Sequence, residues 1–365
     1  MARRHLIGGA VLAAALGLAG SAVSATVPAH RLAGQRIVWS FPGASPPAWL
    51  LAGIRRGDVG AVLLFAGNGT DPARVGRLVG RLQSAPRPPL DPPLLVMSDH
   101  EGGPVRRLAA PPYRGAADLA ALPPSASLRA GREAGAALCR ARVNVDLAPV
   151  LDLARPGSVI ARQGRSFGRR PRDVAARSVA FARGLSEYGV AAAPKHFPGL
   201  GGARETTDAA PVRIGLAPAE LRAQDEAPYR AHIARGVPMV MVGTAVYPSL
   251  SPLPAALATR VVRGELRDRL GFGGIVVSDA LDTPALAPFG DDGRVAVAAA
   301  DAGVDLMPFV SPARARAAQA ALRRALGDGT LDRARAEAAL NRLMTYRRVG
   351  ALIPRGSIAS SARRC

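Results

Sequence analysis

Residues 189–199 read Gly-Val-Ala-Ala-Ala-Pro-Lys-His-Phe-Pro-Gly, a short apolar run that ends in a lysine and a histidine. An apolar run of this length, bounded by Gly and Pro, is typical of a buried strand. Lys195 is the only lysine of a chain that otherwise uses arginine for positive charge. Lysine offers a compact ammonium with three donors, whereas guanidinium is a flat fork, so a Lys-His pair at a strand end suggests a small polyhydroxylated ligand. The alternative is the chance retention of one lysine at a surface turn.

Short apolar runs of this kind recur along the chain and alternate with longer amphipathic stretches rich in Ala and Arg. Strands are expected at residues 36–41, 59–65, 94–98, 143–151, 190–195, 238–243, 274–278 and 304–309. Helices are expected at residues 72–82, 126–141, 171–188, 218–235, 258–270, 291–302 and 312–326. This alternation predicts an α/β fold whose parallel sheet closes into a (β/α)8 TIM-type barrel, with a doubly wound open sheet as the alternative. An extra C-terminal helix over residues 332–347 is expected to pack outside.

Polar residues follow several expected strands at the point where each strand ends. They are Ser98 to Gly103 after the third strand, Asp152 after the fourth, Lys195 and His196 after the fifth, and Ser278 and Asp279 after the seventh. Catalytic groups of a parallel barrel stand at the carboxyl ends of its strands, so these side chains are expected to converge on one axial pocket. A strand-end Asp also commonly caps the next helix, and for Asp152 this is the favoured interpretation.

The two ends of the chain differ from its middle. Residues 1–25 combine a basic start, a short apolar centre and small residues before Ala25, which is the pattern of a secretory signal peptide. Export is therefore expected, to a secreted, periplasmic or wall-associated location, with an uncleaved membrane anchor as the alternative. One barrel domain is expected over residues 26–350, followed by a flexible tail over 351–365.

The chain carries a formal net charge of +21, from 48 basic and 27 acidic side chains. Such a charge favours contact with polyanions, which for an exported protein are acidic wall polymers or lipid headgroups. The arginines are scattered with few aromatic residues among them, which argues against nucleic-acid binding; a generic basic surface from biased composition is the competing explanation. The two cysteines allow no zinc pattern, and neither a metal nor a cofactor is expected.

Four segments, taken together, resemble the N-terminal barrel of glycoside hydrolase family 3, and in particular its single-domain bacterial β-N-acetylglucosaminidases. They read Asp-His-Glu-Gly-Gly-Pro-Val-Arg-Arg at 99–107, Gly-Arg-Ser-Phe-Gly at 164–168, Lys-His-Phe-Pro-Gly at 195–199, and Gly-Phe-Gly-Gly-Ile-Val-Val-Ser-Asp-Ala-Leu at 271–281. The resemblance implies a cofactor-free, retaining glycosidase, expected to be a monomer, that acts on β-linked N-acetylglucosamine or a related sugar, for example in cell-wall fragments.

By that resemblance Asp279 takes the place of the nucleophile, and Asp282, three residues on, is interpreted as a helix cap or loop residue. Glu101 is interpreted as a partner of a nearby arginine. The family positions that hydrogen-bond the hydroxyls of the non-reducing sugar are matched by Asp99, Arg107, Arg165, Lys195 and His196. For the two arginines a structural ion pair within the loops is the alternative.

One loop departs from the family pattern. The single-domain members carry an Asp-x-His pair after the Lys-His segment, in which the His is the general acid/base; here Thr206 and Asp208 occupy those two positions, and Leu200 replaces a common His. One interpretation is that Asp208, or with less support Glu205, serves as the acid/base. Another is that the leaving group is good enough, or the medium acidic enough, for weak general-acid assistance to suffice. The alternatives are a catalytically impaired protein that still binds glycans, and a basic wall-associated scaffold with a vestigial pocket.

The stretch 242–248 lacks the His that the family usually has near the 2-substituent of the sugar, so the preference for an N-acetyl group stays open.

Overall fold

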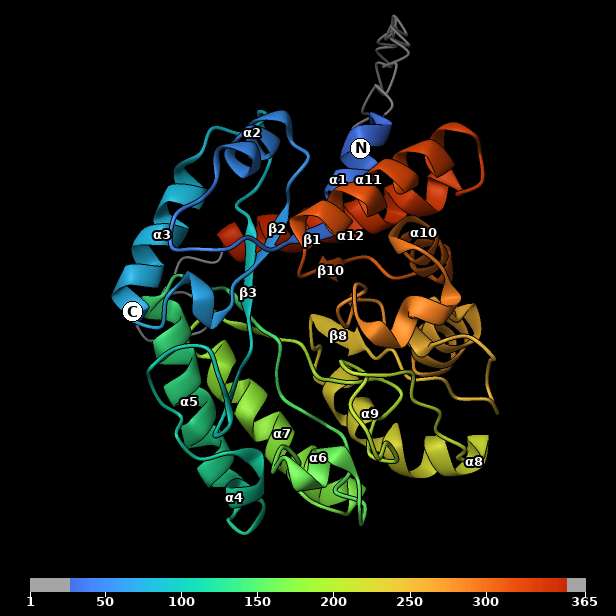
Figure 1. The fold of residues 1–365 in the computed structure, drawn as a ribbon. Coiled ribbons are helices and arrows are strands. Elements are labelled where there is room, and N and C mark those ends of the chain that lie inside the picture. Colours follow the sequence, from blue (N-terminus) through green and yellow to red (C-terminus); the bar gives the residue numbers. More distant parts are fainter. Residues whose placement is uncertain (1–26, 353–365) are drawn as a thin grey trace, which may run out of the picture.

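In the computed structural model, which describes residues 27–352, short parallel strands form the centre and helices surround them (Figure 1). One six-stranded sheet has the order β10–β1–β2–β3–β6–β7, with every pairing parallel. Its strands are β1 (Ile37–Trp39), β2 (Ala61–Leu63), β3 (Leu95–Ser98), β6 (Val145–Asp146), β7 (Ala191–Ala192) and β10 (Met307–Phe309). A second parallel pair joins β8 (Met239–Val242) to β9 (Ile275–Ser278).

Isolated parallel bridges connect this pair to its neighbours on both sides. Phe197, just after β7, bridges Val242 of β8, and Val277 of β9 bridges Leu306, just before β10. Each expected strand thus appears within its expected range, although shorter. The α/β fold with a parallel sheet is confirmed.

The helices also fall where the amphipathic stretches predict them. The expected set appears as α3 (Pro72–Ser84), α5 (Pro124–Arg140), α7 (Pro171–Ser186), α10 (Asp292–Ala302), α11 (Pro312–Gly327), α12 (Arg333–Leu352) and the π-helical η4 (Arg260–Arg269). The expected helix over 218–235 is divided into α8 (Pro218–Glu220), the contiguous π-helical η2 (Leu221–Asp225) and α9 (Ala227–Ile233). The break at Glu226 lies where Pro228 has no N–H to continue the helical ladder.

Several short elements have no counterpart in the sequence prediction. They are α1 (Ala29–Gly34), α2 (Ala48–Arg56), α4 (Ala116–Ala120), α6 (Val159–Arg162), the short 3₁₀ turns, and an antiparallel hairpin of β4 (His100–Gly102) with β5 (Val105–Arg106). The hairpin matters for function, since it holds the segment that follows β3. Helix α1 packs against α11, and Arg333 at the start of α12 donates to Val27 O just before α1 (Figure 1).

The strands bury both of their faces, as expected for a parallel sheet covered by helices. In β1, Ile37 and Trp39 belong to the large cluster shared with the surrounding helices, whereas Val38 belongs to a second, central cluster with side chains of the other strands. Successive side chains of a strand point to opposite faces, which explains this division. The carboxyl ends of the strands are therefore rigidly positioned from two sides.

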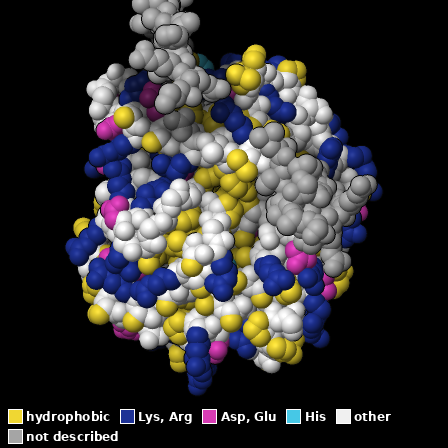
Figure 2. All heavy atoms as spheres, turned by 180° about the vertical axis from the view of Figure 1, so that it is seen from behind, with side chains coloured by type: hydrophobic (Ala, Val, Ile, Leu, Met, Phe, Trp, Pro, Cys, Tyr) yellow, Lys and Arg dark blue, Asp and Glu magenta, His cyan; other side chains and the backbone are white. Residues whose placement is uncertain are grey.

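The expected signal peptide lies outside the described residues, and so does the expected tail from residue 353 on; α12 continues past residue 350 to Leu352. Between residues 27 and 352 no helix combines the length and the hydropathy needed to cross a membrane. Basic side chains are spread over the face seen in Figure 2 among hydrophobic and uncharged ones.

Candidate active site

A cavity of about 570 Å³ opens at the carboxyl ends of the strands. It collects residues that lie far apart in the sequence, from the segments after β3, β7 and β9 and from the loop that follows residue 199. All the sequence-predicted site residues line it, namely Asp99, Arg107, Arg165, Lys195, His196, Asp208 and Asp279, and Glu101 joins them. The predicted convergence of strand ends therefore occurs in the structure.

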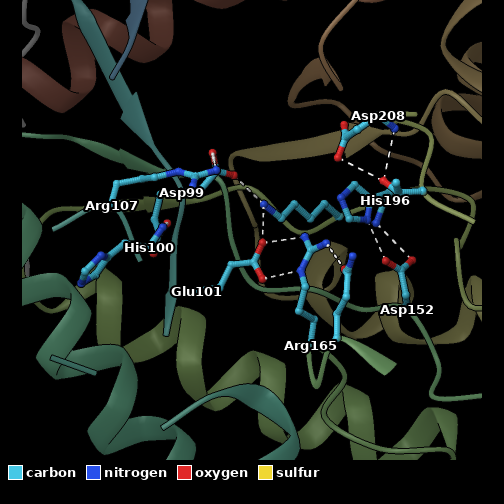
Figure 3. A network of polar contacts seen from close by, with 12 residues as sticks. Asp99, His100, Glu101, Arg107, Asp152, Arg165, His196 and Asp208 are labelled. Carbon is cyan, nitrogen blue, oxygen red and sulfur yellow. Dashed lines mark hydrogen bonds and ion pairs between the residues drawn. The ribbon is translucent and has the colours of Figure 1, made fainter. Parts of the chain in front are cut away.

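Lys195 is the cation shared by the carboxylates of Asp99 and Glu101, both of which are labelled in Figure 3, and the three residues form a buried ion cluster at the cavity wall. Its Nζ lies 2.7 Å from Asp99 Oδ1 and 2.7 Å from Glu101 Oε1, and the residue is only 2% exposed. Burial alone would lower the pKa of Lys195, but Asp99 and Glu101 outweigh it and hold that pKa above its usual value. The ammonium is thus permanently charged and has already committed two of its donors to protein carboxylates.

Glu101 binds two cations at once. Arg165 donates from Nε and from NH2 to its two carboxylate oxygens, over 2.9 Å and 2.8 Å, while Lys195 bonds it from the other side. Burial alone would raise the pKa of Glu101, but Lys195 and Arg165 lower it to about 2. Glu101 and Arg165 are thus a bidentate pair that faces the cavity, which agrees with the expected arginine partner of Glu101.

Arg107 makes a looser contact with the cluster. Its NH2 group lies 3.7 Å from Asp99 Oδ2, and its guanidinium lies over the ring of Phe65, 5.7 Å from the centroid. The side chain is about a third exposed. Arg107 is therefore the most accessible cation of the group for an incoming ligand.

His196 is oriented by Asp152, a residue for which the sequence favoured a helix-capping role. Asp152 is 1% exposed and accepts from His196 Nδ1 at 2.7 Å, from His196 N at 3.2 Å and from Leu200 N at 2.6 Å. It caps no helix; the favoured interpretation of Asp152 is wrong because its oxygens are turned toward the segment after β7. With Nδ1 engaged, Nε2 is the ring nitrogen of His196 left for a ligand.

Asp279 directly follows β9 and is partly buried in the cavity wall. Its backbone N–H donates to Val242 O over 2.8 Å, and its Oδ1 accepts from Ala280 N at 2.8 Å. Burial raises the pKa of Asp279, His196 and Lys195 oppose that rise, and Asp208 adds to it. Asp282 instead accepts from Val310 N and Ser311 N and fixes the loop after β10, as its interpretation as a loop residue requires.

The loop that carries Asp208 is held at several points. Ala203 O accepts from Val159 N at 2.8 Å, and Thr207 O accepts from the hydroxyl of Thr283 at 2.5 Å. Asp208 itself is exposed at the cavity edge, where its Oδ2 accepts from Thr206 Oγ1 at 3.1 Å. A carboxylate thus faces the cavity where the family pattern has a histidine.

A further acidic residue, which sequence reasoning missed, lies beneath the cluster. Asp146 in β6 is fully buried, and its Oδ1 accepts from His100 N at 2.9 Å. Burial raises its pKa to about 8 despite that bond and the nearby Lys195. Asp146 is thus mostly protonated at neutral pH and adds little negative charge under Lys195. No sequence signal distinguishes it from a strand-end cap.

Within the described range, no group of three or more His, Cys, Asp and Glu side chains is arranged to hold a metal ion. The polar side chains that line the cavity are acid/base and hydrogen-bonding groups, and apolar side chains such as Phe65 and Met241 complete its wall. The arrangement can bind a hydroxyl-rich ring and bring one carboxylate to attack it.

Comparison with known proteins gives consistent results. The model of the glycosyl hydrolase family 3 N-terminal domain matches residues 46–346. An uncharacterized secreted glycosyl hydrolase of Arthroderma benhamiae is 40% identical over 283 residues, which are 75% of this chain and 80% of that protein. A β-hexosaminidase of Xylella fastidiosa is 35% identical over 265 residues, 70% of this chain and 77% of the relative.

Two solved structures share the fold. A family 3 β-N-acetylglucosaminidase from Paenibacillus has a TM-score of 0.83 and 32% identity; the match covers 89% of this chain and 63% of that longer one. A β-N-acetylhexosaminidase from Beutenbergia cavernae has a TM-score of 0.80 and 30% identity, over 88% of this chain and 99% of that one.

Proposed function

This chain belongs to glycosyl hydrolase family 3 and is a β-hexosaminidase-like glycosidase, and on that premise we propose that it is a retaining hydrolase releasing β-linked N-acetylglucosamine, or a related sugar, from a non-reducing end. One observation carries the proposal: a single cavity holds the partly buried carboxylate of Asp279 together with the Lys195 cluster and the oriented His196. We also infer that the strands form a closed (β/α)8 barrel; the bridges Phe197–Val242 and Val277–Leu306 support this.

The sugar-binding role falls to the charged groups of the cavity. Asp99 offers carboxylate oxygens to sugar hydroxyls, while Arg107, Arg165, Lys195 and His196 offer donors. Because Glu101 and Asp99 already hold Lys195 and Arg165 in place, these donors meet the ligand without reorganising.

The chemistry takes two displacements. The Asp279 carboxylate attacks the anomeric carbon, the bond to the leaving oxygen breaks, and Asp208 gives that oxygen its proton. A water molecule, deprotonated by Asp208, then attacks the same carbon and releases Asp279. Two inversions give net retention.

The proposed assignment of Asp208 is tested with leaving groups. We expect Asp208→Ala to lower kcat/KM about 10²- to 10⁴-fold for an aryl β-N-acetylglucosaminide with a poor leaving group, and little for one with a good leaving group, since only the former needs a proton. Steady-state kinetics on both substrates, with product configuration read by NMR, provide the measurement. Azide should restore kcat of the variant and yield the β-glycosyl azide.

A different outcome would favour the alternative. If the wild-type protein turns over neither aryl β-N-acetylglucosaminide nor aryl β-glucoside, yet binds the free sugar, it is a glycan-binding pseudoenzyme of the same fold. Comparison of the two aryl substrates also measures the preference for the N-acetyl group.

Asp152 gives a prediction on pH dependence. In Asp152→Asn an amide replaces the carboxylate that accepts from His196 Nδ1, so a positive charge on the ring loses its buried counter-charge. The charge of His196 lowers the pKa of Asp279. Since Asp279 must be ionised to attack, and a weaker charge on His196 lowers its pKa less, we expect the acidic limb of the kcat/KM profile to move to higher pH. An unchanged limb would show that Asp152 does not act on the nucleophile.

The protein is exported by residues 1–25, its barrel domain begins near residue 26, and it acts as a monomer on carbohydrate such as cell-wall fragments. The secreted relative of Arthroderma benhamiae supports export. The net charge of +21 supports contact with anionic wall polymers.

A further inference from the structure

We infer that two threonines, Thr206 and Thr283, are positioning residues that together hold the carboxylate of Asp208 in the cavity and take over the task that the family assigns to the aspartate of its Asp-x-His pair. The inference rests on the proposed function, because it assumes that Asp208 exchanges a proton with the substrate.

Thr206 bonds Asp208 twice. Its hydroxyl donates to Asp208 Oδ2 over 3.1 Å and accepts from the Asp208 backbone N–H at 3.2 Å. The hydroxyl therefore fixes both the backbone and the side chain of the residue two positions on. Thr206 also lines the cavity, so the pair faces the substrate together.

Thr283 connects this loop to the loop of the proposed nucleophile. It lies four residues after Asp279 and directly before η5 (Pro284–Phe289), at a position where a Thr hydroxyl normally accepts from the first turn of the helix. The hydroxyl makes no such capping bond, and instead donates to Thr207 O over 2.5 Å. Both Thr207 and Thr283 are buried.

The bond from Thr283 fixes the position of one loop relative to the other. Thr207 is the residue between Thr206 and Asp208, so the bond from Thr283 ties the segment of the proposed acid/base to the segment of the proposed nucleophile. A retaining glycosidase needs a fixed separation between its two carboxyl groups. One bond between the two loops, from Thr283, and one within the Asp208 loop, from Thr206, provide that constraint without a histidine.

The test uses Thr283→Val and Thr206→Val, which remove a hydroxyl at nearly constant volume. We expect each to lower kcat/KM about tenfold for the poor-leaving-group aryl β-N-acetylglucosaminide and less than about twofold for the good one. Thr283→Ser keeps the donor and should stay within about threefold of wild type on both substrates. Thr259→Val is the matched control, since Thr259 is exposed and makes no side-chain capping bond.

A double-mutant cycle separates positioning from general stability. If the threonines act through Asp208, adding Thr283→Val or Thr206→Val to Asp208→Ala causes less than about a twofold further loss. The inference would be overturned if a threonine-to-valine substitution lowered kcat/KM for the poor substrate tenfold both in the wild type and in Asp208→Ala. It would also be overturned if Thr283→Ser were as impaired as Thr283→Val. If Thr283→Val does not fold, the Thr206→Val cycle and Thr283→Ser decide.

The proposed function fails in a different way. In that case the wild-type protein itself would turn over neither aryl substrate, whereas an Asp208→Ala variant that cleaves the poor substrate at the wild-type rate would reject only Asp208 as the acid/base. A large effect of Asp208→Ala with no effect of either threonine would instead retain the function and reject the positioning role.

Discussion

Asp279→Ala is expected to reduce the turnover of aryl β-N-acetylglucosaminides by about 10⁴-fold or more, whatever the leaving group, because no covalent intermediate can then form. The structure supports this size of effect, since Asp279 is partly buried in the cavity wall and its backbone is fixed by the bond to Val242 O. The measurement is kcat/KM on good and poor leaving groups. Azide should restore turnover and give the α-glycosyl azide, the opposite configuration from that expected for Asp208→Ala.

Asp282→Ala is the matched control, because Asp282 is the only other aspartate near the end of β9 in sequence. Its carboxylate bonds Val310 N and Ser311 N and does not line the cavity. We expect a loss of less than about tenfold, uniform over leaving groups. If Asp282→Ala abolished turnover and Asp279→Ala did not, the assignment of the nucleophile would be wrong.

The sequence predicts the strands and strand-end residues well, because both follow from local patterns. A run such as 274–278 is apolar, flanked by glycine and ended by Ser-Asp, and it becomes β9 with Asp279 beside the cavity. Such signals need no knowledge of distant residues.

The contact partners of buried side chains, by contrast, do not follow from local sequence patterns. Asp152 and Asp146 both follow or end apolar runs, yet Asp152 orients His196 while Asp146 is buried beneath the Lys195 cluster. Nothing within a few residues of either predicts its partner, because the partners come from other strands. The β4–β5 hairpin is not predicted for a different reason: its segment has the glycines of a turn but no alternation of apolar and polar residues that would indicate strands.

The single lysine also acquires a more specific meaning from the structure. Its compact ammonium sits within 2.7 Å of oxygens of both Asp99 and Glu101, and both carboxylates line the cavity. A guanidinium is larger and binds carboxylates as a planar fork. Lys195 therefore holds the carboxylates of Asp99 and Glu101 in place at the cavity wall, in addition to its proposed role as a donor to a sugar.

Glu101→Gln is expected to destabilise the protein by about 3 kcal/mol at pH 7, because it leaves Lys195 and Arg165 without a shared buried carboxylate. The pH dependence follows from the pKa of Glu101, which is about 2 in the folded protein against an ordinary value of 4.5. A depressed carboxyl pKa contributes stability that is complete above the unfolded value and is lost as pH falls through the folded one. The difference between wild type and variant should therefore shrink between about pH 4.5 and pH 2, as measured by denaturant unfolding.

Glu337→Gln provides the comparison at the surface. Glu337 pairs with Arg333 over 3.0 Å within α12, and both side chains are more than a third exposed. Such a pair contributes about 0.5 kcal/mol or less, so the control should change little at any pH. Burial, rather than the mere presence of an ion pair, is the reason for the large loss of stability expected in Glu101→Gln. Equal losses of stability in Glu101→Gln and Glu337→Gln would therefore contradict the buried cluster that holds Lys195. A loss confined to Glu101→Gln, with weaker sugar binding at the same time, would tie the stability of the cluster to its proposed binding role.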